Sequence, residues 1–526
     1  EAAAAWSVDF DVDQLKGLLP DRESSDVLSC LADLRSSGFI EDSSTAAGSS
    51  TFRIRNALLR EAAYLQCKKE RLAELHERAA AYAEVQGYGP DFMGYHLERA
   101  FRLRKEAVPD DPRNGSVAEK AANHLHAAGR GERARGATTS AADLFRRALD
   151  LRLVLGPAWF DDSIELTDCL LDLARTREAL EMVKLIQETA PQLGDAVVSA
   201  RADLMKVFAK SLTSTDPTIE KSFRELLPIF EAQGDHRTLV KIYRGLSEFY
   251  WNLFECGASA SAAESALQHS LETPEKFELA HIVSAVSYGL IWGPAPVSEA
   301  MAAGERLLTI SVGNLVSLAQ LKLKLGLLDA FAGNFDAARK RAESGLRELR
   351  ELGQERFAAI RTHDVGIVQM MAGELTTAYE TFLAGYNELT RLDMIDYRAT
   401  SAAYLARIDY ELGRAEQALK YLAIAEETAE EDPWIEPDTL PLRAQMAADA
   451  GERDRALKFI GAARALADGK DSTVIQATIE ILTARALRTL GMEEKAAEAQ
   501  AKAEALCKKK EAPALLALAD PTSMKS

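Results

Sequence analysis

The chain has 526 residues, of which 47% are hydrophobic and 7% aromatic, and its formal net charge at pH 7 is −18. A single hydrophobic core seldom serves more than ~250–300 residues, so this length predicts several domains or a repeat array. The acidic balance argues against nucleic-acid binding as the main activity. No apolar run has the length of a membrane span.

Five cysteines are scattered along the chain without metal-binding or redox spacing, which favours a reducing, cytoplasmic location. The sequence also lacks a phosphate-binding P-loop, an HExxH zinc motif and a GxSxG nucleophile motif. We therefore expect no metal, no cofactor and no catalytic residue in this chain. Because the chain starts at Glu1 and not at methionine, we expect it to be a piece of a longer protein.

Residues 1–66 are predicted to form a small winged-helix-like domain. Apolar residues at helical spacing indicate two short helices, and two short runs rich in strand-forming residues follow them. A serine-rich stretch between those runs indicates a hairpin. The expected elements are a helix around Leu15–Leu19, a helix over 27–34 capped by Asp26, strands at 39–40 and 51–54, and a mobile tip over 43–50.

The rest of the chain is predicted to be a helical linker over 67–117, about ten helical hairpins over 118–507 and a flexible tail over 508–526. The hairpins are indicated by small residues that recur at intervals of 38 or 40 positions, a period typical of stacked repeats. The recurring glycines are Gly333, Gly373, Gly413, Gly451 and Gly491, and the alanines five positions after them are Ala338, Ala378, Ala418, Ala456 and Ala496.

These residue types have a physical reason. A residue that follows a helix often adopts the left-handed conformation, which glycine reaches without a Cβ penalty. Seven positions before each glycine and twelve after it stand only glycine or alanine, for example Gly326 and Gly345 around Gly333. Small side chains at these places would let two antiparallel helices cross closely.

This frame of small residues resembles the tetratricopeptide (TPR) repeat, with a period nearer forty residues and mostly without the terminal proline of the standard repeat. The resemblance implies an all-α fold: a right-handed superhelical array of TPR-like helical hairpins, preceded by the small winged-helix domain. In such an array the first helices of the hairpins form a continuous concave surface.

The segment from Ile54 to Tyr64 resembles the FRHxLIREAxY signature of STAND ATPases, a family of multidomain signalling proteins. Trp6–Leu19 and Met93–Ala100 are similar to elements that flank the signature in that family. The resemblance implies that a nucleotide-binding module precedes the winged helix and that the repeats act as its sensor. Many relatives also carry an adenylate or guanylate cyclase, and others carry a DNA-binding module.

The STAND family usually has histidine at the position of Asn56. In some relatives that histidine reaches the bound nucleotide, so the resemblance makes Asn56 and Arg55 candidates for an interdomain or nucleotide-sensing contact. Asparagine can donate a hydrogen bond there but carries no charge. The alternative is that Asn56 only caps the helix that begins at Ala57.

Candidates for partner binding come from the offsets at which the TPR family places groove-facing side chains. Arginine and tyrosine in such a groove suit an acidic or extended peptide. The alternative is that these are ordinary solvated positions. The candidates are His363, Met370, Arg407, Tyr410, Gln445, Arg485 and Arg488.

Three functions remain open on the sequence. The chain could be the non-catalytic regulatory arm of a STAND-type ATPase, with a protein or peptide and its own upstream ATPase domain as partners. It could be a stand-alone TPR scaffold for protein assembly. It could also be part of a DNA-binding regulator, but Asp26 and Asp33 in the expected recognition helix repel phosphate, so DNA is the least favoured partner.

Overall fold

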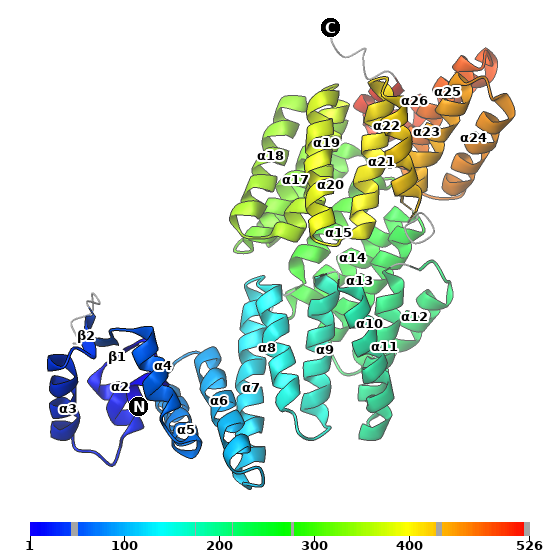
Figure 1. The fold of residues 1–526 in the computed structure, drawn as a ribbon. Coiled ribbons are helices and arrows are strands. Elements are labelled where there is room, and N and C mark those ends of the chain that lie inside the picture. Colours follow the sequence, from blue (N-terminus) through cyan, green and yellow to red (C-terminus); the bar gives the residue numbers. More distant parts are fainter. Residues whose placement is uncertain (44–50, 174, 213, 275–277, 428–433, 520–526) are drawn as a thin grey trace. The chain divides into compact units, whose positions relative to one another are not determined.

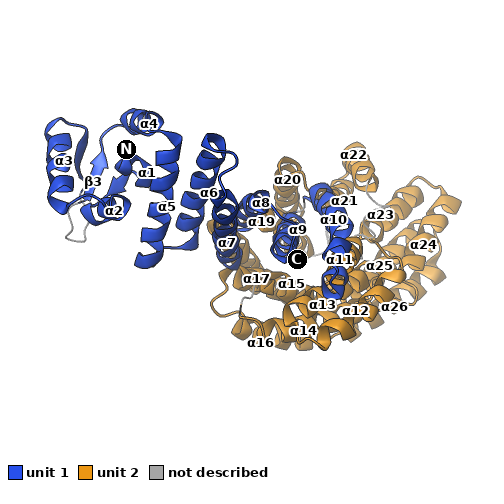
Figure 2. Cartoon of the chain, turned by 90° about the horizontal axis from the view of Figure 1, so that it is seen from below, with its two compact units in different colours: residues 1–199 blue, residues 200–526 orange. Residues whose placement is uncertain are grey.

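The all-α class is confirmed. The computed structural model describes residues 1–43, 51–173, 175–212, 214–274, 278–427 and 434–519, and these ranges contain twenty-six α-helices and three short strands (Figure 1). The chain divides into two compact units, unit 1 over residues 1–199 and unit 2 over residues 200–526 (Figure 2). Each unit is considered by itself below.

Unit 1 begins with short helices around a small sheet. The three strands are antiparallel in the order β1-β3-β2, and Phe10 of β1 lies opposite Phe52 of β3. The elements are α1 Ala2–Trp6, β1 Asp9–Phe10, α2 Val12–Leu18, α3 Ser24–Ser36, β2 Ile40–Ser43, β3 Thr51–Ile54 and α4 Ala57–Leu65. Strand β1 was not expected, and residues 44–50 of the predicted tip lie outside the described residues.

The core of this part forms between the helices and the sheet. Trp6, Phe10 and Leu18 are buried together with Leu72 of helix α5 (Lys69–Gln86). Helix α2 is closed at its start by a capping box, in which the Asp11 side chain accepts the Gln14 N–H and the Gln14 side chain accepts the Asp11 N–H. The prediction for α3 was wrong in one detail, since the helix begins at Ser24 and Asp26 lies in its first turn.

The remaining helices of unit 1 form antiparallel pairs. Helices α5 and α6 pack together, as do α7 with α8 and α9 with α10. Helices α5 and α6 fill the region predicted as a helical linker. Their bounds are α5 Lys69–Gln86, α6 Pro90–Ala107, α7 Arg113–Ala134, α8 Thr138–Leu151, α9 Pro157–Asp172 and α10 Thr176–Thr189, followed by the 3-10 helix η1 Ala190–Leu193.

Unit 2 is a run of helical hairpins, in which first helices such as α17 pack on the second helices that follow them. The bounds are α11 Ala196–Ser211 (which starts in unit 1), α12 Thr218–Glu231, α13 His236–Asn252, α14 Cys256–Leu271, α15 Leu279–Trp292, α16 Val297–Ile310, α17 Leu315–Phe331, α18 Phe335–Glu351, α19 Glu355–Met371, α20 Leu375–Arg391, α21 Ile395–Glu411, α22 Ala415–Glu426, α23 Glu436–Asp449, α24 Arg453–Ala467, α25 Thr473–Thr489, α26 Glu493–Lys510 and the 3-10 helix η2 Pro513–Ala519. The described helices from α7 to α26 are twenty, that is ten consecutive pairs.

The predicted roles of the recurring glycines and alanines agree with the geometry. All five glycines that follow the first helices have positive φ, from +69° at Gly491 to +89° at Gly333, in the region that favours glycine. The alanines five positions later are fully buried. A Cβ at Gly366 would lie 2.5 Å from the ring of Phe382, so the close crossing of α19 and α20 requires a residue without a side chain.

The end of the chain departs from the prediction of a flexible tail over 508–526. Helix α26 runs through Lys510, whose side chain is fully buried, and Ala512 and Leu515 are buried after it. Residues 520–526 lie outside the described residues. The prediction failed because the partners of this segment lie more than 200 positions earlier, at the end of α15 and on the loop between α15 and α16.

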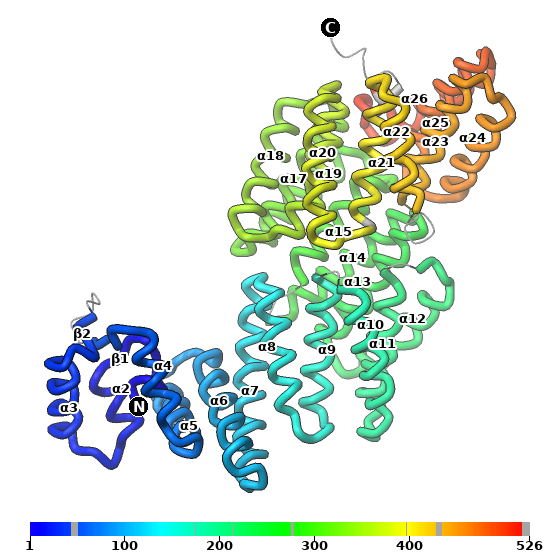
Figure 3. The backbone as a smooth tube through the Cα atoms, in the orientation of Figure 1, coloured from blue at the N-terminus to red at the C-terminus, as the bar shows by residue number. Residues whose placement is uncertain are grey.

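Unit 2 also differs from an array in which each repeat contacts only its neighbours. Its last helices return to its middle, so that α25 contacts α15 (Figure 3). The Asp471 carboxylate accepts the Gly257 N–H at 2.9 Å, and the indole of Trp434 stacks on that of Trp251 with ring centroids 4.0 Å apart. Repeats far apart in sequence therefore contact one another directly within unit 2.

Candidate binding face of the repeat array

The first helices of the hairpins form one face of unit 2. Helices α15, α17 and α19 contact one another in succession, and so do α21, α23 and α25. We call the side of unit 2 formed by these six helices the first-helix face. All seven predicted partner-binding residues lie on these helices.

One polar network on this face is buried. Lys324 of α17 donates to Asp364 Oδ2 of α19 at 2.6 Å, and the Tyr288 hydroxyl of α15 donates to Asp364 Oδ1 at 3.0 Å. Arg361 of α19 donates to the Tyr288 hydroxyl, and the Lys324 ammonium lies 3.4 Å from the centre of the Tyr288 ring. We call Tyr288, Lys324, Arg361 and Asp364 the Lys324 network.

The Lys324 network holds charge where solvent is nearly excluded. Lys324 is 1% exposed and Asp364 is 2% exposed. Burial lowers the pKa of Lys324 to about 8, although Asp364 opposes this shift. Burying ion pairs seldom stabilises a fold more than apolar residues of the same size would. Charged residues kept at such positions are therefore candidates for a binding or specificity role.

A second network contains three of the predicted residues. Tyr410 of α21 donates to Asp449 of α23, and the Gln445 amide donates to Asp449 and to Thr489 of α25, each at 3.1 Å. Arg485 of α25 pairs with Glu411 of α21. The six residues Tyr410, Glu411, Gln445, Asp449, Arg485 and Thr489 are called the Tyr410 network. The carbonyl oxygen of the Gln445 side chain is buried and accepts no hydrogen bond from the described residues.

The other predicted partner-binding residues do not join this network. His363 is buried and shares a hydrogen bond with the Ser401 hydroxyl at 2.7 Å, and burial lowers its pKa to about 4. Met370 belongs to the apolar core. Arg488 is exposed on α25 and donates to Gln500 of α26.

Arg407 is the predicted residue with the least satisfied polar group. Its side chain is 5% exposed, and among the described residues its Nη2 has no hydrogen-bond acceptor. The Asp438 carboxyl lies in its electrostatic range, and burial raises the pKa of Asp438 to about 6. A buried guanidinium nitrogen without an acceptor is costly, and an anionic group would satisfy it.

In unit 1, the alternative role of Asn56 agrees with the geometry. Its side-chain oxygen accepts the Leu58 N–H at 2.8 Å and so caps α4, while Arg55 lies 3.5 Å from Glu41 in an exposed ion pair. A contact with nucleotide stays a prediction. Helix α4 buries none of its side chains, and Leu58 and Leu65 are 72% and 71% exposed.

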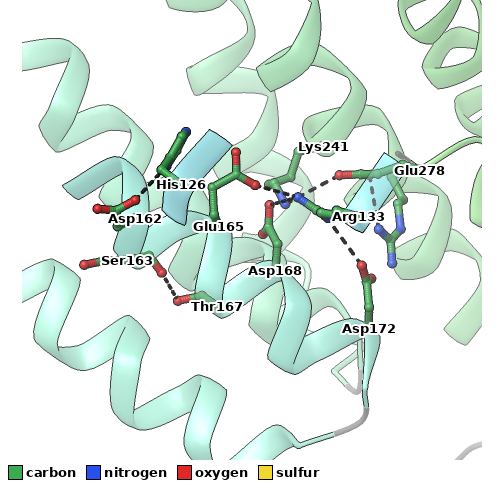
Figure 4. A network of polar contacts seen from close by, with 11 residues as sticks. His126, Arg133, Asp162, Ser163, Glu165, Thr167, Asp168, Asp172, Lys241 and Glu278 are labelled. Atoms are coloured by element: carbon green, nitrogen blue, oxygen red, sulfur yellow. Dashed lines mark hydrogen bonds and ion pairs between the residues drawn. The ribbon is translucent and has the colours of Figure 1, made fainter. Parts of the chain in front are cut away.

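A buried network in unit 1 was missed by the sequence analysis. Arg133 of α7 donates to Glu165 at 2.9 Å and lies 3.5 Å from Asp168 and Asp172, all on α9 (Figure 4). Two turns earlier on α7, His126 contacts Asp162 of α9 at 2.6 Å. The acidic residues of α9 recur every three or four positions, which was the available signal for a helix face turned toward a cation.

The predicted DNA-recognition helix α3 is unsuited to phosphate. Asp26 and Asp33 are exposed on it, and its Arg35 is paired with Asp42 of β2. Because DNA binding depends on free cations, this surface does not favour a duplex. Across the described residues, no helix is both long and apolar enough to cross a membrane.

Comparison with known proteins places the fold but no family. No protein family matches the sequence, and no curated protein is similar to it. Among solved structures, a Rap protein complexed with competence and sporulation factor is similar over 68% of this chain and 99% of its own, with a TM-score of 0.51 and 13% identity.

Two further solved structures are less similar. A STAND protein with a tetratricopeptide repeat sensor from Pyrococcus horikoshii matches 82% of this chain and 64% of its own, with a TM-score of 0.48 and 13% identity. The Rap conjugation gene regulator of plasmid pLS20, in complex with the Phr* peptide, matches 68% and 98%, with a TM-score of 0.43 and 14% identity. At such identities the likeness concerns the fold alone.

Proposed function

We propose that this chain is the non-catalytic regulatory and sensor arm of a STAND-type signalling ATPase, and that it binds a protein or peptide on the first-helix face of unit 2. The observation that carries the proposal is the charge on that face. The Lys324 network and Arg407 hold ionisable groups in positions where a purely structural array would need only apolar residues. An acidic group on an extended chain can satisfy the Arg407 guanidinium, whose Nη2 has no acceptor among the described residues.

Other observations support parts of this proposal. The Rap protein that shares the fold is complexed with competence and sporulation factor, which favours a ligand-binding role for a fold of this kind. The exposed leucines of α4 lie in the segment that resembles the STAND signature, and an exposed apolar helix face suits an interface with an ATPase domain. Nucleotide cyclase linkage rests on the family resemblance alone.

Partner binding is tested by capture with matched charge variants. Arg485→Gln and Arg488→Gln remove two cations from the first-helix face at half-buried and exposed positions. Lys420→Gln and Arg455→Gln remove two exposed cations from the second helices α22 and α24. A protein retained by the second variant and lost by the first supports the proposal, and equal recovery on both contradicts it. Arg407 is left unchanged because its burial would confuse binding with folding.

The link to an ATPase is tested in the protein extended upstream to include its nucleotide-binding module. Regulation by the repeats predicts that removing residues 118–507 changes the rate of ATP hydrolysis several-fold. Identical rates with and without these residues would leave a free-standing scaffold as the better account. Duplex DNA binding that weakens strongly with salt would instead favour a DNA-binding regulator.

A further inference from the structure

The buried end of α26 meets the joint between α15 and α16. The Lys510 ammonium donates three hydrogen bonds to main-chain oxygens, to Leu290 and Gly293 at 2.8 Å and to Ala295 at 2.6 Å. An ammonium has three N–H groups, so these three acceptors satisfy it completely. The cation of a buried lysine is thus held by backbone carbonyls.

The two helix ends at this joint bind side chains of the charge that each helix dipole favours, a cation at the end of α15 and an anion at the start of α16. The oxygens of Leu290 and Gly293 belong to the C-terminal end of α15, where carbonyls lack helical partners and the helix dipole favours a cation. The carboxylate of the next residue, Glu511, accepts the Ser298 N–H at 3.0 Å in the first turn of α16, where an anion is favoured. A lysine followed by an acid therefore matches the joint.

The residues after Glu511 continue onto the first-helix face. Ala512, Ala514 and Leu515 are buried in the same apolar cluster as Ile291 and Ile481. Helix η2 contacts α17, α19 and α25, which belong to the face that the TPR resemblance assigns to partner binding. The chain's own C-terminal segment thus covers part of the surface that a partner would need.

We propose that this joint and the adjoining first-helix face are a peptide-binding site that residues 510–517 of the chain itself occupy. The site takes, from a partner protein, a segment of the same chemistry: a lysine, an acidic residue and then small apolar residues. The covalently attached segment competes at a high effective concentration, so a partner binds only when its contacts exceed those of residues 510–517. This inference rests on the proposed function, whose peptide it describes.

The test uses the full chain and a synthetic peptide with the sequence of residues 508–517. Lys510→Met together with Leu515→Asp in the full chain removes the cation and expels the apolar part of the segment. The peptide is expected to bind this variant at least tenfold more tightly than the wild type and to raise its melting temperature, since a ligand stabilises the form that it binds. The matched control is Lys508→Met. Lys508 is exposed on α26, two residues before Lys510, and this variant should behave as the wild type.

A second peptide, with methionine in place of its third lysine (the equivalent of Lys510), tests the three hydrogen bonds to the main-chain oxygens. It should not bind the variant tightly or raise its melting temperature. A folded variant that binds neither peptide would overturn the inference, because the contact would then be only a structural cap. If the variant does not fold, the test is the amide hydrogen-exchange rate of the wild type, measured with and without excess peptide. Displacement predicts faster exchange at Ala512 and Leu515 with Ser298 still protected, and unchanged exchange contradicts it.

Failure of this inference and failure of the proposed function are distinguishable. A natural partner captured through the first-helix face, without any effect of the peptide, would reject only the occupied site. Binding of the peptide without a captured partner would leave the site in place and reject the sensor role.

Discussion

Lys324 and Asp364 form a salt bridge of 2.6 Å between α17 and α19, at positions where neither side chain reaches solvent. The two residues are forty positions apart in sequence, so the bridge joins one repeat to the next. It joins two first helices through charge and leaves the face between them polar.

Removing one partner of the bridge should destabilise unit 2 strongly. Asp364→Ala leaves the Lys324 cation buried without an anion, and the expected loss in the free energy of unfolding is about 3–5 kcal/mol. Lys324→Met combined with Asp364→Leu should recover part of that loss, because the Lys324 cation is removed with its anion, while the buried Arg361 keeps the Tyr288 hydroxyl as its partner. Urea denaturation of the full chain followed by circular dichroism measures both. A loss below about 1 kcal/mol for Asp364→Ala would show that solvent reaches the pair.

Replacing single glycines of the array by alanine should change the free energy of unfolding by amounts that follow a defined order. Gly413→Ala forces a side chain into a conformation with φ of +75°, and the expected cost is about 1 kcal/mol. Gly366→Ala should cost more, since its Cβ meets the Phe382 ring. Gly461→Ala is the control, because its Cβ would meet nothing within 4 Å inside helix α24, and it should stabilise by about 0.5–1 kcal/mol. Equal effects at all three positions would contradict the close-crossing account.

Acid should loosen unit 1 through a buried histidine pair. The Nδ1 atoms of His76 and His96 lie 2.7 Å apart, and burial lowers their pKa values to about 3 and about 4. Below pH 6.5 the unfolded chain binds protons that the folded chain does not, so stability falls as the pH drops toward 4. The expected loss by pH 4.5 is on the order of 2–3 kcal/mol for each histidine.

Hydrogen-exchange protection of the amides in α5 and α6 measures this effect. Replacing both residues, as His76→Phe with His96→Phe, should make protection in these helices nearly independent of pH between 7 and 4.5. The same pH dependence in the variant as in the wild type would assign the acid sensitivity to other groups.

Arg133 should be essential to unit 1. Arg133→Met removes the buried cation that contacts Glu165 and Asp168, with an expected loss of about 3–5 kcal/mol. Arg135→Met is the control, since Arg135 is exposed and its pair with Glu132 contributes at most about 1 kcal/mol. Thermal melts of the two variants compare them. Similar melting temperatures would mean that the Arg133 network adds no net stability.

The helical repeats were predictable because their signal is local. A glycine such as Gly413 and the alanine five positions later are dictated by one helix end and one helix crossing, which the spacing reveals. Strand β1 was not predictable, since its two residues form a strand only by pairing with β3. Lys510 resembled part of a polar tail because its three acceptors lie 215 to 220 positions earlier, at the end of α15 and on the loop that follows it.

The candidate site was predictable only in part. The standard TPR offsets selected positions on the first helices, and the structure brings three of these residues, Tyr410, Gln445 and Arg485, into one network. They also selected Met370, which is buried in the core because α19 is enclosed on all sides: each of its residues from Ala358 to Met371 is buried. The Lys324 network has no sequence motif, since its four residues come from three helices.

The measurement that most directly tests partner binding on the first-helix face is photo-crosslinking in cells of the source organism. A photoreactive phenylalanine in place of Tyr410 reports on that face, and one in place of the exposed Lys420 reports on the second helices. The account predicts a protein or peptide adduct from position 410 and none from position 420. An adduct from position 420 alone would contradict it.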